Sequence, residues 1–580
     1  MRSLLPLSLF LTVLDVLHTV RAVVPFEVIT SNNPPAHRLG RRAVPISNNG
    51  NAAYMANITL GGVGVSVILD TGSSDLWVSF PGTPPTTTDT GKSISLNYAV
   101  GSASGTIHKA ELKFDNYTVP DQAFLQVADS SSFSTNSAFN GLVGLGPSDG
   151  SAILDKIKGN AGETMLSRIF QQNKTSSNYI TFLLDRKNDP SASFTGQFTI
   201  AETVKGLENI TSQTKLNVET VHRLLDDQQH WQAITDKDSV IGPDGTTLAI
   251  KSIVPKAPKG QLVAVFDSGF TFSQVPRELS DAIYGRVQGA VYDAKNEWWT
   301  VPCAQELNVT FHFGGVAFPM HPLDVVDDNF KILDTAGNRV CIGAFQPITS
   351  AFSLFGNFDM IMGMTFLRNA YTLMDYGEWI ERTSNDRGDP FMQLLPLTNR
   401  ATAHADFVKV RLNGVDTTGS SQFALLPASQ QQHSPVSAEE KKKKYEEMIL
   451  SRWPYIVTGS LVGFILLVGF IIWRCCCRNR RAKKKASAKG FFEPKSETYL
   501  PLQVHGQGSP PATSSPYQHH QQESQQSLNS QQAAYNHNPQ YSQQNFHQPP
   551  PSQYYQQGYP QQGYQQQGYQ QQQQGYGYAS

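Results

Sequence analysis

The sequence predicts a mainly β protein: one large unit of two lobes related by a pseudo-twofold axis, then one transmembrane helix and a disordered tail. Three observations lead to this prediction. Short β-rich runs alternate with Gly, Asn, Ser and Pro turns from Tyr54 onward. An apolar strand that ends in Asp and a Gly turn occurs twice, at Asp70 and at Asp267. An uncharged apolar run of 19 residues extends from Tyr455 to Trp473.

The N-terminal region has the composition of a targeting segment. Residues 1–22 carry Arg2, an apolar run and a small residue, Ala22, at the end, which is typical of a secretory signal peptide. An apolar N-terminal helix of the mature fold is the alternative. Residues 23–42 form a short pro-segment that ends in Arg41-Arg42, a dibasic pair at which maturation would cut. A solvated basic turn is the alternative for this pair.

The globular part is expected over residues 43–400, with lobes of approximately 43–215 and 216–400, a length sufficient for a large two-lobed core. The spacing of its apolar runs predicts a mostly antiparallel architecture. The clearest strands are 56–60, 63–69, 76–80, 106–114 and 180–184. Helices are predicted over Glu163 to Gln172 and over Glu278 to Gln288, the second after Pro276.

The C-terminal part is predicted to cross a membrane once. The polar residues 401–453 are interpreted as a stalk, and 454–473 as the transmembrane helix, since 19 residues span about 28 Å as a helix. A buried core helix is the alternative. Basic residues are concentrated after the helix, which with the signal peptide predicts a type I protein with a cytoplasmic tail, 474–580.

The tail differs in composition from the rest of the chain. Residues 501–580 hold 26 Gln and 10 Tyr but no Lys or Arg, and repeated Gly-Tyr pairs lie among Gln runs, so they cannot form an ordinary core. Self-association or recruitment of cytosolic partners is one interpretation, and an unselected solvated tail is the other. The juxtamembrane cysteines Cys475, Cys476 and Cys477 suggest S-palmitoylation, against unmodified thiols.

Charge and motif content exclude two classes of protein. Nine Lys/Arg and three Asp/Glu follow Trp473, so residues 1–473 have a net charge of −7 against −1 for the whole chain. A strongly basic nucleic-acid-binding domain is therefore excluded. The sequence has no CxxC pair, HExxH motif or Cys/His cluster, so we expect no metal and no organic cofactor.

Modification signals agree with a luminal N-terminal part. All five glycosylation sequons precede the membrane segment. Their asparagines are Asn57, Asn116, Asn173, Asn209 and Asn308. Cys303 and Cys341 are an even pair in an oxidising compartment, which is most simply one disulfide.

The duplicated motif carries the chemistry. The segments 67–73 and 263–269 each deliver an Asp into a tight turn, at Asp70 and Asp267, and an apolar-apolar-Gly element follows each, at 142–144 and 361–363. Two such lobes would bring the carboxyl groups together, where they share a proton. One then acts as base on a water while the other acts as acid toward a carbonyl oxygen.

The residues around each Asp fit this chemistry. Gly72 and Gly269 permit close approach of the backbone, and the hydroxyls of Thr71 and Ser268 can hold the two turns by hydrogen bonds.

These motifs resemble those of pepsin-like aspartic endopeptidases, most of all fungal secreted and membrane-anchored members, over roughly residues 54–396. Residues 70–78, Asp-Thr-Gly-Ser-Ser-Asp-Leu-Trp-Val, are similar to the first active-site signature, which includes Ser73. Residues 98–105 resemble the flap hairpin, which implies that Tyr98 closes over substrate and hydrogen-bonds with Trp77. Residues 139–146 and 361–368 resemble the later landmarks, and Cys303 and Cys341 fall where the family's C-terminal disulfide is expected.

Two positions depart from the family pattern. Phe270 stands where the second signature usually has Ser or Thr, whose hydroxyl supports the catalytic carboxylate. Losing such a hydrogen bond costs about 1.5–3 kcal/mol. The sequence leaves open whether the hydroxyl of the neighbouring Thr271 replaces the missing donor. Met364 replaces an Asp that is common after the last landmark glycine.

The predicted function is that of an aspartic-type endopeptidase, made as a zymogen, that hydrolyses protein peptide bonds at acidic pH. Its partners are protein or peptide substrates and one membrane, and no nucleic acid. The predicted location is the secretory pathway, with the N-terminal domain at the cell surface or in a lumen. Two alternatives remain: a catalytically inactive binding or sensing module, suggested by Phe270 and the tail, and a structural cell-wall anchor.

Overall fold

The computed structural model describes residues 43–487 except for 99–100, 130–138, 188, 192–193, 195, 222–227, 350–356, 381–387, 437–440, 443–444, 447 and 450–451. The predicted signal peptide, the pro-segment with its Arg41-Arg42 pair, and residues 488–580 of the predicted tail lie outside the described residues. The described part is mainly β, as the sequence predicts.

The first half of the chain forms an eight-stranded sheet. Its order is β2–β3–β4–β9–β5–β8–β7–β6. The strands are β2 (Ser47–Asn49), β3 (Ala53–Leu60), β4 (Val63–Asp70), β5 (Leu76–Val78), β6 (Thr88–Asn97), β7 (Ser102–Phe114), β8 (Tyr117–Asp129) and β9 (Gly141–Gly144). Neighbouring strands are mostly antiparallel, but β4 pairs with β9 in parallel, and so does β5 with β8.

The second half is divided among three smaller sheets. The five-stranded sheet has the order β13 (Gln232–Ile234), β15 (Val263–Phe266), β24 (Met360–Met362), β16 (Ser273–Val275) and β23 (Phe345–Pro347). The four-stranded sheet consists of β17 (Val291–Asp293), β18 (Trp298–Val301), β22 (Cys341–Gly343) and β21 (Val326–Asp327). The three-stranded sheet consists of β14 (Val240–Ile241), β19 (Thr310–Phe313) and β20 (Val316–Pro319).

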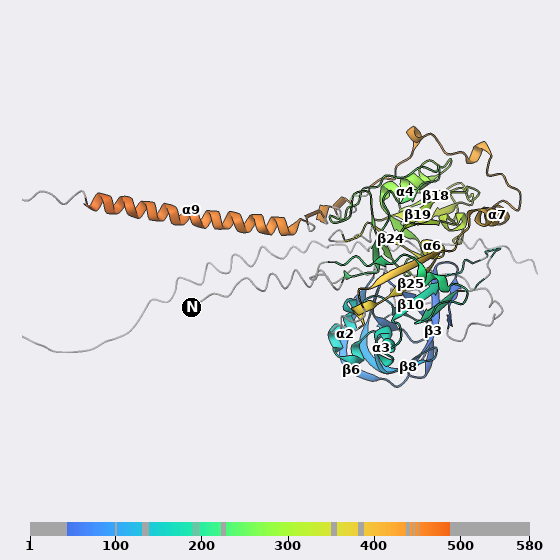
Figure 1. Ribbon diagram of the computed structural model, residues 1–580, viewed down its shortest axis with the longest axis horizontal. Coiled ribbons are helices and arrows are strands. Elements are labelled where there is room, and N and C mark those ends of the chain that lie inside the picture. The colour runs from blue at the N-terminus through green and yellow to red at the C-terminus, as the bar shows by residue number, and fades with distance from the viewer. Residues whose placement is uncertain are drawn as a thin grey trace, which may run out of the picture. The chain divides into compact units, whose positions relative to one another are not determined.

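A six-stranded sheet joins the two halves. Its order is β1 (Ala43–Pro45), β11 (Gln197–Ile200), β10 (Tyr179–Leu183), β25 (Ala370–Asp375), β26 (Phe391–Pro396) and β12 (Leu216–Asn217). The central pair is antiparallel, with Thr181 opposite Leu373. Figure 1 shows β10 and β25 between the first-half elements α2, α3, β6 and β8 and the second-half elements α4, β18 and β19. Strands from both ends of the globular part therefore form one layer under both lobes.

Short helices cover the sheets. They are α2 (Ala152–Ile157), α3 (Met165–Gln172), α4 (Arg277–Tyr284), α5 (Pro322–Val325), α6 (Met364–Leu367) and α7 (Arg400–Arg411). Single 3-10 turns occur at Ser148–Gly150, Asn160–Gly162, Glu208–Ser212, Gly377–Trp379, Ser421–Phe423 and Ala428–Gln430. The two predicted helices are confirmed as α3 and α4, although α4 ends at Tyr284 because Gly285 and Gly289 follow.

Residues 400–434 differ from the predicted stalk. Asn399 caps the N-terminus of α7 through its side-chain oxygen, and Ala403 and Phe407, one turn apart, are buried. Farther along, Ser434 is buried, where its backbone N–H and its hydroxyl donate to the Asp281 carboxylate of α4 at 3.1 and 2.6 Å. The segment therefore packs on the second lobe instead of leaving it at residue 400.

The helix α9 (Trp453–Ser487) contains the predicted membrane span. Its segment Pro454–Arg474 has a mean hydropathy of 2.4 and is long and apolar enough to cross a bilayer. None of this segment is buried against other described residues. Length and composition are thus those of a single membrane helix, as predicted.

Candidate active site

Asp70 is the last residue of β4, and strand pairing determines where it lies. Its strand pairs in parallel with β9, so that Asp70 stands opposite Gly144. The matching strand β15 pairs in parallel with β24, with Phe266 opposite Met362, and Asp267 follows at the strand end. Each apolar-apolar-Gly element found in the sequence is therefore the partner strand of one Asp. These two parallel pairs are exceptions in the mostly antiparallel architecture that the sequence predicted.

The glycines of these elements are needed for close packing. A Cβ on Gly144 would lie 2.4 Å from the backbone carbon of Ser74, and one on Gly363 would lie 2.6 Å from the carbonyl oxygen of Phe270. Real Cβ atoms do not approach so closely, so each glycine lets one strand pass against the turn that follows its Asp.

The two Asp turns are joined by reciprocal hydrogen bonds, as the sequence predicted for Thr71 and Ser268. The backbone N–H of Thr71 donates to Oγ of Ser268 at 3.0 Å, and the backbone N–H of Ser268 donates to Oγ1 of Thr71 at 2.9 Å. Each hydroxyl donates in turn across the interface, Thr71 to the carbonyl of Phe266 at 2.9 Å and Ser268 to that of Leu69 at 2.7 Å. The four bonds bring residues 195 to 199 positions apart into contact.

The turn that follows Asp70 lies against the carboxyl group of Asp267. The N–H of Gly72 donates to Asp70 at 2.9 Å, and the N–H of Gly269 donates to Asp267 at 2.7 Å. A Cβ on Gly72 would lie 2.1 Å from Oδ2 of Asp267, so the first turn touches the second carboxyl group. Both Asp residues are buried.

The two carboxyl groups have unequal hydrogen-bond partners. The hydroxyl of Ser73 donates to Asp70, whereas the corresponding Phe270 packs with Val265 and Ile361 in a hydrophobic cluster. Thr271 does not replace the missing donor, because its hydroxyl donates to the carbonyl of Ala52 at 2.8 Å.

This environment shifts the titration of Asp267. Burial, followed by the nearby Asp70 carboxylate, raises the pKa of Asp267 well above its usual value, and the N–H of Gly269 only partly opposes the shift. Asp267 therefore retains a proton at pH values where an exposed Asp is ionised.

Tyr98 and Trp77 lie close to each other in the first lobe. Both are buried in one hydrophobic cluster with Leu96 and Leu142. The backbone N–H of Tyr98 donates to the carbonyl of Gly101 at 3.0 Å, which closes the hairpin between β6 and β7. The hydrogen bond between their side chains stays a prediction.

A family comparison identifies this arrangement. A sequence model described as eukaryotic aspartyl protease matches residues 53–380, more than half of the chain and both Asp turns. The chain belongs to the eukaryotic aspartyl protease family.

Two curated proteins and one solved structure are similar to this chain. The probable aspartic-type endopeptidase CTSD of Arthroderma benhamiae is 23% identical over 377 residues, 61% of this chain and 65% of the relative. The vacuolar protease A of Neurospora crassa is 24% identical over 364 residues, 58% of this chain and 80% of the relative. The crystal structure of the aspartic proteinase from Irpex lacteus is 19% identical and covers 62% of this chain and 99% of its own, with a TM-score of 0.47. The chain thus spans less than two thirds of the first relative's length.

The protein also contains a charged cluster that sequence reasoning missed. Asp324 lies between two buried arginines: Nε of Arg186 donates to it at 3.0 Å and Nε of Arg368 at 2.7 Å. The arginines hold the pKa of Asp324 well below its usual range, despite full burial. Since Arg186 belongs to the first lobe, the cluster is a second link between the lobes. No local pattern marks these residues, which are 138 and 44 positions apart.

Asp75 is another functional residue for which the sequence analysis had no role. Its carboxylate accepts hydrogen bonds from the hydroxyl of Ser151 at 2.5 Å and from the backbone N–H groups of Ala152 and Ile153 at 3.0 and 3.1 Å. It thereby anchors the N-terminus of α2 to the loop that carries Asp70. In the sequence, the only sign of a role for Asp75 was its position within residues 70–78, the segment that resembles the first active-site signature.

The remaining predicted residues are found as follows. Cys303 and Cys341 form a disulfide, with their Cα atoms 5.0 Å apart. The five sequon asparagines, at positions 57, 116, 173, 209 and 308, are all exposed. Among the residues that the structure describes, no group of three or more His, Cys, Asp or Glu side chains could hold a metal ion.

Proposed function

We propose that the protein is an aspartic endopeptidase that hydrolyses peptide bonds of protein substrates at acidic pH through Asp70 and Asp267. The proposal is supported by the reciprocal Thr71 and Ser268 hydrogen bonds, which join the two Asp turns, by the burial of both Asp residues, and by the contact of the Gly72 turn with the Asp267 carboxyl group. Membership of the aspartyl protease family supports the same activity.

The unequal environments suggest a role for each Asp. Asp267, with its raised pKa, holds the proton, and Asp70, which accepts hydrogen bonds from Ser73 and Gly72, is the carboxylate. A water attacks the substrate carbonyl carbon while Asp70 takes a proton from it and Asp267 gives its proton to the carbonyl oxygen. The C–N bond of the resulting diol then breaks as a proton passes to the nitrogen, and the peptide leaves as an acid and an amine.

Substrate would be held by the hairpin of β6 and β7. Tyr98 is proposed to cover the bound peptide, supported by Trp77 behind it in the same cluster. Gly72 leaves room for the carboxyl group of Asp267, since a Cβ on Gly72 would lie 2.1 Å from Oδ2 of Asp267. The chemistry needs only these side chains and water.

We propose a type I arrangement in the secretory pathway. The signal peptide, five exposed sequon asparagines and the apolar segment of α9 all agree with a luminal or extracellular catalytic domain. Removal of the pro-segment after Arg42 would leave Ala43, the first residue of β1, as the new N-terminus. The basic and Gln-rich tail would face the cytosol, where palmitoylation or partner binding could occur.

The test is hydrolysis of a denatured protein by the full chain, purified in detergent, between about pH 3 and 7. Asp70→Asn and Asp267→Asn are each expected to abolish cleavage. Asp238→Asn is the matched control, because Asp238 is exposed and has a positive φ, which Asn tolerates well. Cleavage that survives in both active-site variants, or that does not decline toward neutral pH, would contradict the proposal. Absence of cleavage by the folded parent, after its pro-segment has been removed at Arg42, would favour the inactive binding module instead.

A further inference from the structure

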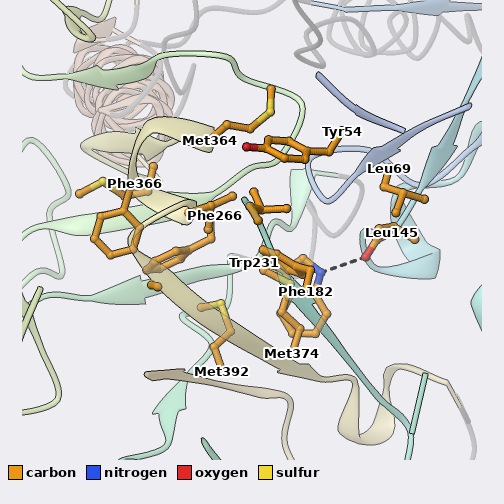
Figure 2. Packing of buried hydrophobic residues seen from close by; sticks show 14 of the residues in the cluster. Tyr54, Leu69, Leu145, Phe182, Trp231, Phe266, Met364, Phe366, Met374 and Met392 are labelled. Carbon is orange, nitrogen blue, oxygen red and sulfur yellow. Dashed lines mark hydrogen bonds between the residues drawn. The ribbon is translucent and has the colours of Figure 1, made fainter. Parts of the chain in front are cut away.

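Trp231 bonds to the strand of Asp267 and to Leu145, the residue that binds the backbone of Asp70. Its backbone carbonyl accepts a hydrogen bond at 2.8 Å from the N–H of Phe266, the residue before Asp267. Its indole N–H donates at 3.0 Å to the carbonyl of Leu145, a residue of the other lobe (Figure 2). Leu145 in turn donates its own N–H to the backbone carbonyl of Asp70 at 2.7 Å. Trp231 thus connects the strand that leads into Asp267 with the residue that binds the Asp70 carbonyl.

Tyr376 is a second donor to the same carbonyl. Its hydroxyl donates to the Leu145 carbonyl at 2.6 Å. Tyr376 follows β25, in the six-stranded sheet that joins the lobes. A carbonyl oxygen has two lone pairs, so the indole and the phenol together satisfy it.

The two donors are held rigidly by their surroundings. Trp231 and Tyr376 are buried, with ring centroids 4.9 Å apart and planes at 90°. Trp379 packs on the other side of the indole at 4.8 Å, and Phe170 of α3 packs on Tyr376 at 5.6 Å. In Figure 2, Trp231 lies among Phe182, Met374 and Leu145. Neither donor can therefore turn away from the Leu145 carbonyl without disturbing a packed core.

We propose that Trp231 and Tyr376 are positioning residues for Asp70. They clamp the Leu145 peptide from the second lobe and from the sheet between the lobes, and Leu145 then holds the backbone at Asp70. This clamp is separate from the Thr71 and Ser268 bonds, which join the two Asp segments directly and do not involve Leu145. Through this clamp, the packing of the two lobes against each other influences the orientation of the Asp70 carboxylate.

The inference rests on the proposed function, and its test separates the two. Trp231→Phe and Tyr376→Phe each remove one donor and retain a ring. Tyr371→Phe is the matched control, because Tyr371 is a buried tyrosine of β25 whose hydroxyl donates to Thr181 at 2.8 Å, with no contact to either Asp turn among the described hydrogen bonds. All variants are made in the full chain, and kcat, KM and the melting temperature are measured.

Each single variant leaves the Leu145 carbonyl with one donor, whereas the double variant leaves it buried with none. We expect kcat to fall about threefold in each single variant and at least about 30-fold in the double, more than the product of the singles, with KM nearly constant. Tyr371→Phe is expected to lower the melting temperature by a similar amount and to leave kcat unchanged. A merely structural role would not separate kcat from KM in this way.

Hydrogen exchange at the Leu145 amide tests the clamp without a measurement of catalysis. Because this amide donates to Asp70, we expect its exchange to accelerate in the double variant and not in Tyr371→Phe. The inference is overturned if the folded double variant retains the parent kcat, if the loss appears only in KM, or if the Leu145 amide exchanges as in the parent. Loss of all cleavage in Asp70→Asn, beside normal cleavage in the double variant, would uphold the proposed function and refute the clamp.

Discussion

Replacing Phe270 with threonine is expected to move the alkaline limb of the pH–activity profile to lower pH. The backbone of the second turn has the same geometry as the first, since the glycine N–H donates to the Asp in both, at 2.9 Å for Asp70 and 2.7 Å for Asp267. In the first turn, the hydroxyl of Ser73 reaches the Asp carboxylate. A hydroxyl at position 270 can therefore reach Asp267, which lacks one in the parent.

The magnitude follows from the charge of the acceptor. A hydrogen bond to a charged group is worth about 1.5–3 kcal/mol. At about 1.4 kcal/mol for each tenfold change in proton affinity, the alkaline limb should move down by about one to two pH units. The sign is downward because the new bond stabilises the ionised form of Asp267, so the dyad loses its shared proton at lower pH.

The assay is kcat/KM against pH from about 3 to 8, since this quantity reports the essential acid and base of the free enzyme. Phe270 is 3% exposed within its cluster, and the smaller side chain is expected to cost about 2–4 kcal/mol of stability, so the melting temperature is measured beside activity. Phe270→Leu is the control, because it keeps the site apolar and brings no donor. An alkaline limb that stays in place, or that shifts equally in Phe270→Leu, would refute the reasoning.

Three further predictions concern the same core. Asp267→Asn should raise the free energy of unfolding at pH 7 more than at pH 4. The raised pKa of Asp267 makes the parent lose stability as the pH rises above the pKa of about 4 that Asp has in the unfolded chain. Equal changes in the urea midpoint at both pH values would contradict this prediction. Gly72→Ala places a Cβ 2.1 Å from Asp267, so kcat should fall at least about 100-fold in a folded protein, whereas Gly64→Ala, where the Cβ meets nothing within 4 Å, should be neutral. Asp324→Asn removes the carboxylate that the two buried arginines share and leaves Arg186 with Asp189 alone, which should cost about 3–5 kcal/mol by urea unfolding at neutral pH. The ion pairs of Asp324 should persist in acid, because the pKa of Asp324 is lowered. Their contribution to stability is complete above about pH 4 and is lost only as the pH falls toward the pKa of Asp324. A variant as stable as the parent would exclude this role.

Much of the candidate site could be predicted from the sequence because its signals are local. The Asp turns, their glycines and the apolar-apolar-Gly elements are short motifs, and their duplication predicted that Asp70 and Asp267 lie together. The membrane segment of α9 was equally readable, since a bilayer sets its length and polarity within one helix.

Other features depend on contacts between segments far apart in the chain. That Thr271 bonds to Ala52 and so cannot support Asp267 was open in the sequence, because it depends on where the first lobe packs. Residues 400–434 looked polar, yet Phe407 and Ser434 are buried against the second lobe, where partners such as Asp281 satisfy the polar groups.

The sequence by itself thus determined the two Asp turns and the order of the motifs around them, because covalent neighbours encode turns, strands and a long apolar helix. Tertiary structure alone decided which groups surround the two Asp residues. The Leu145 carbonyl receives donors from Trp231 and Tyr376, 86 and 231 positions away. Such contacts follow from which lobe surfaces meet when apolar area is buried, and no local period or motif records that choice.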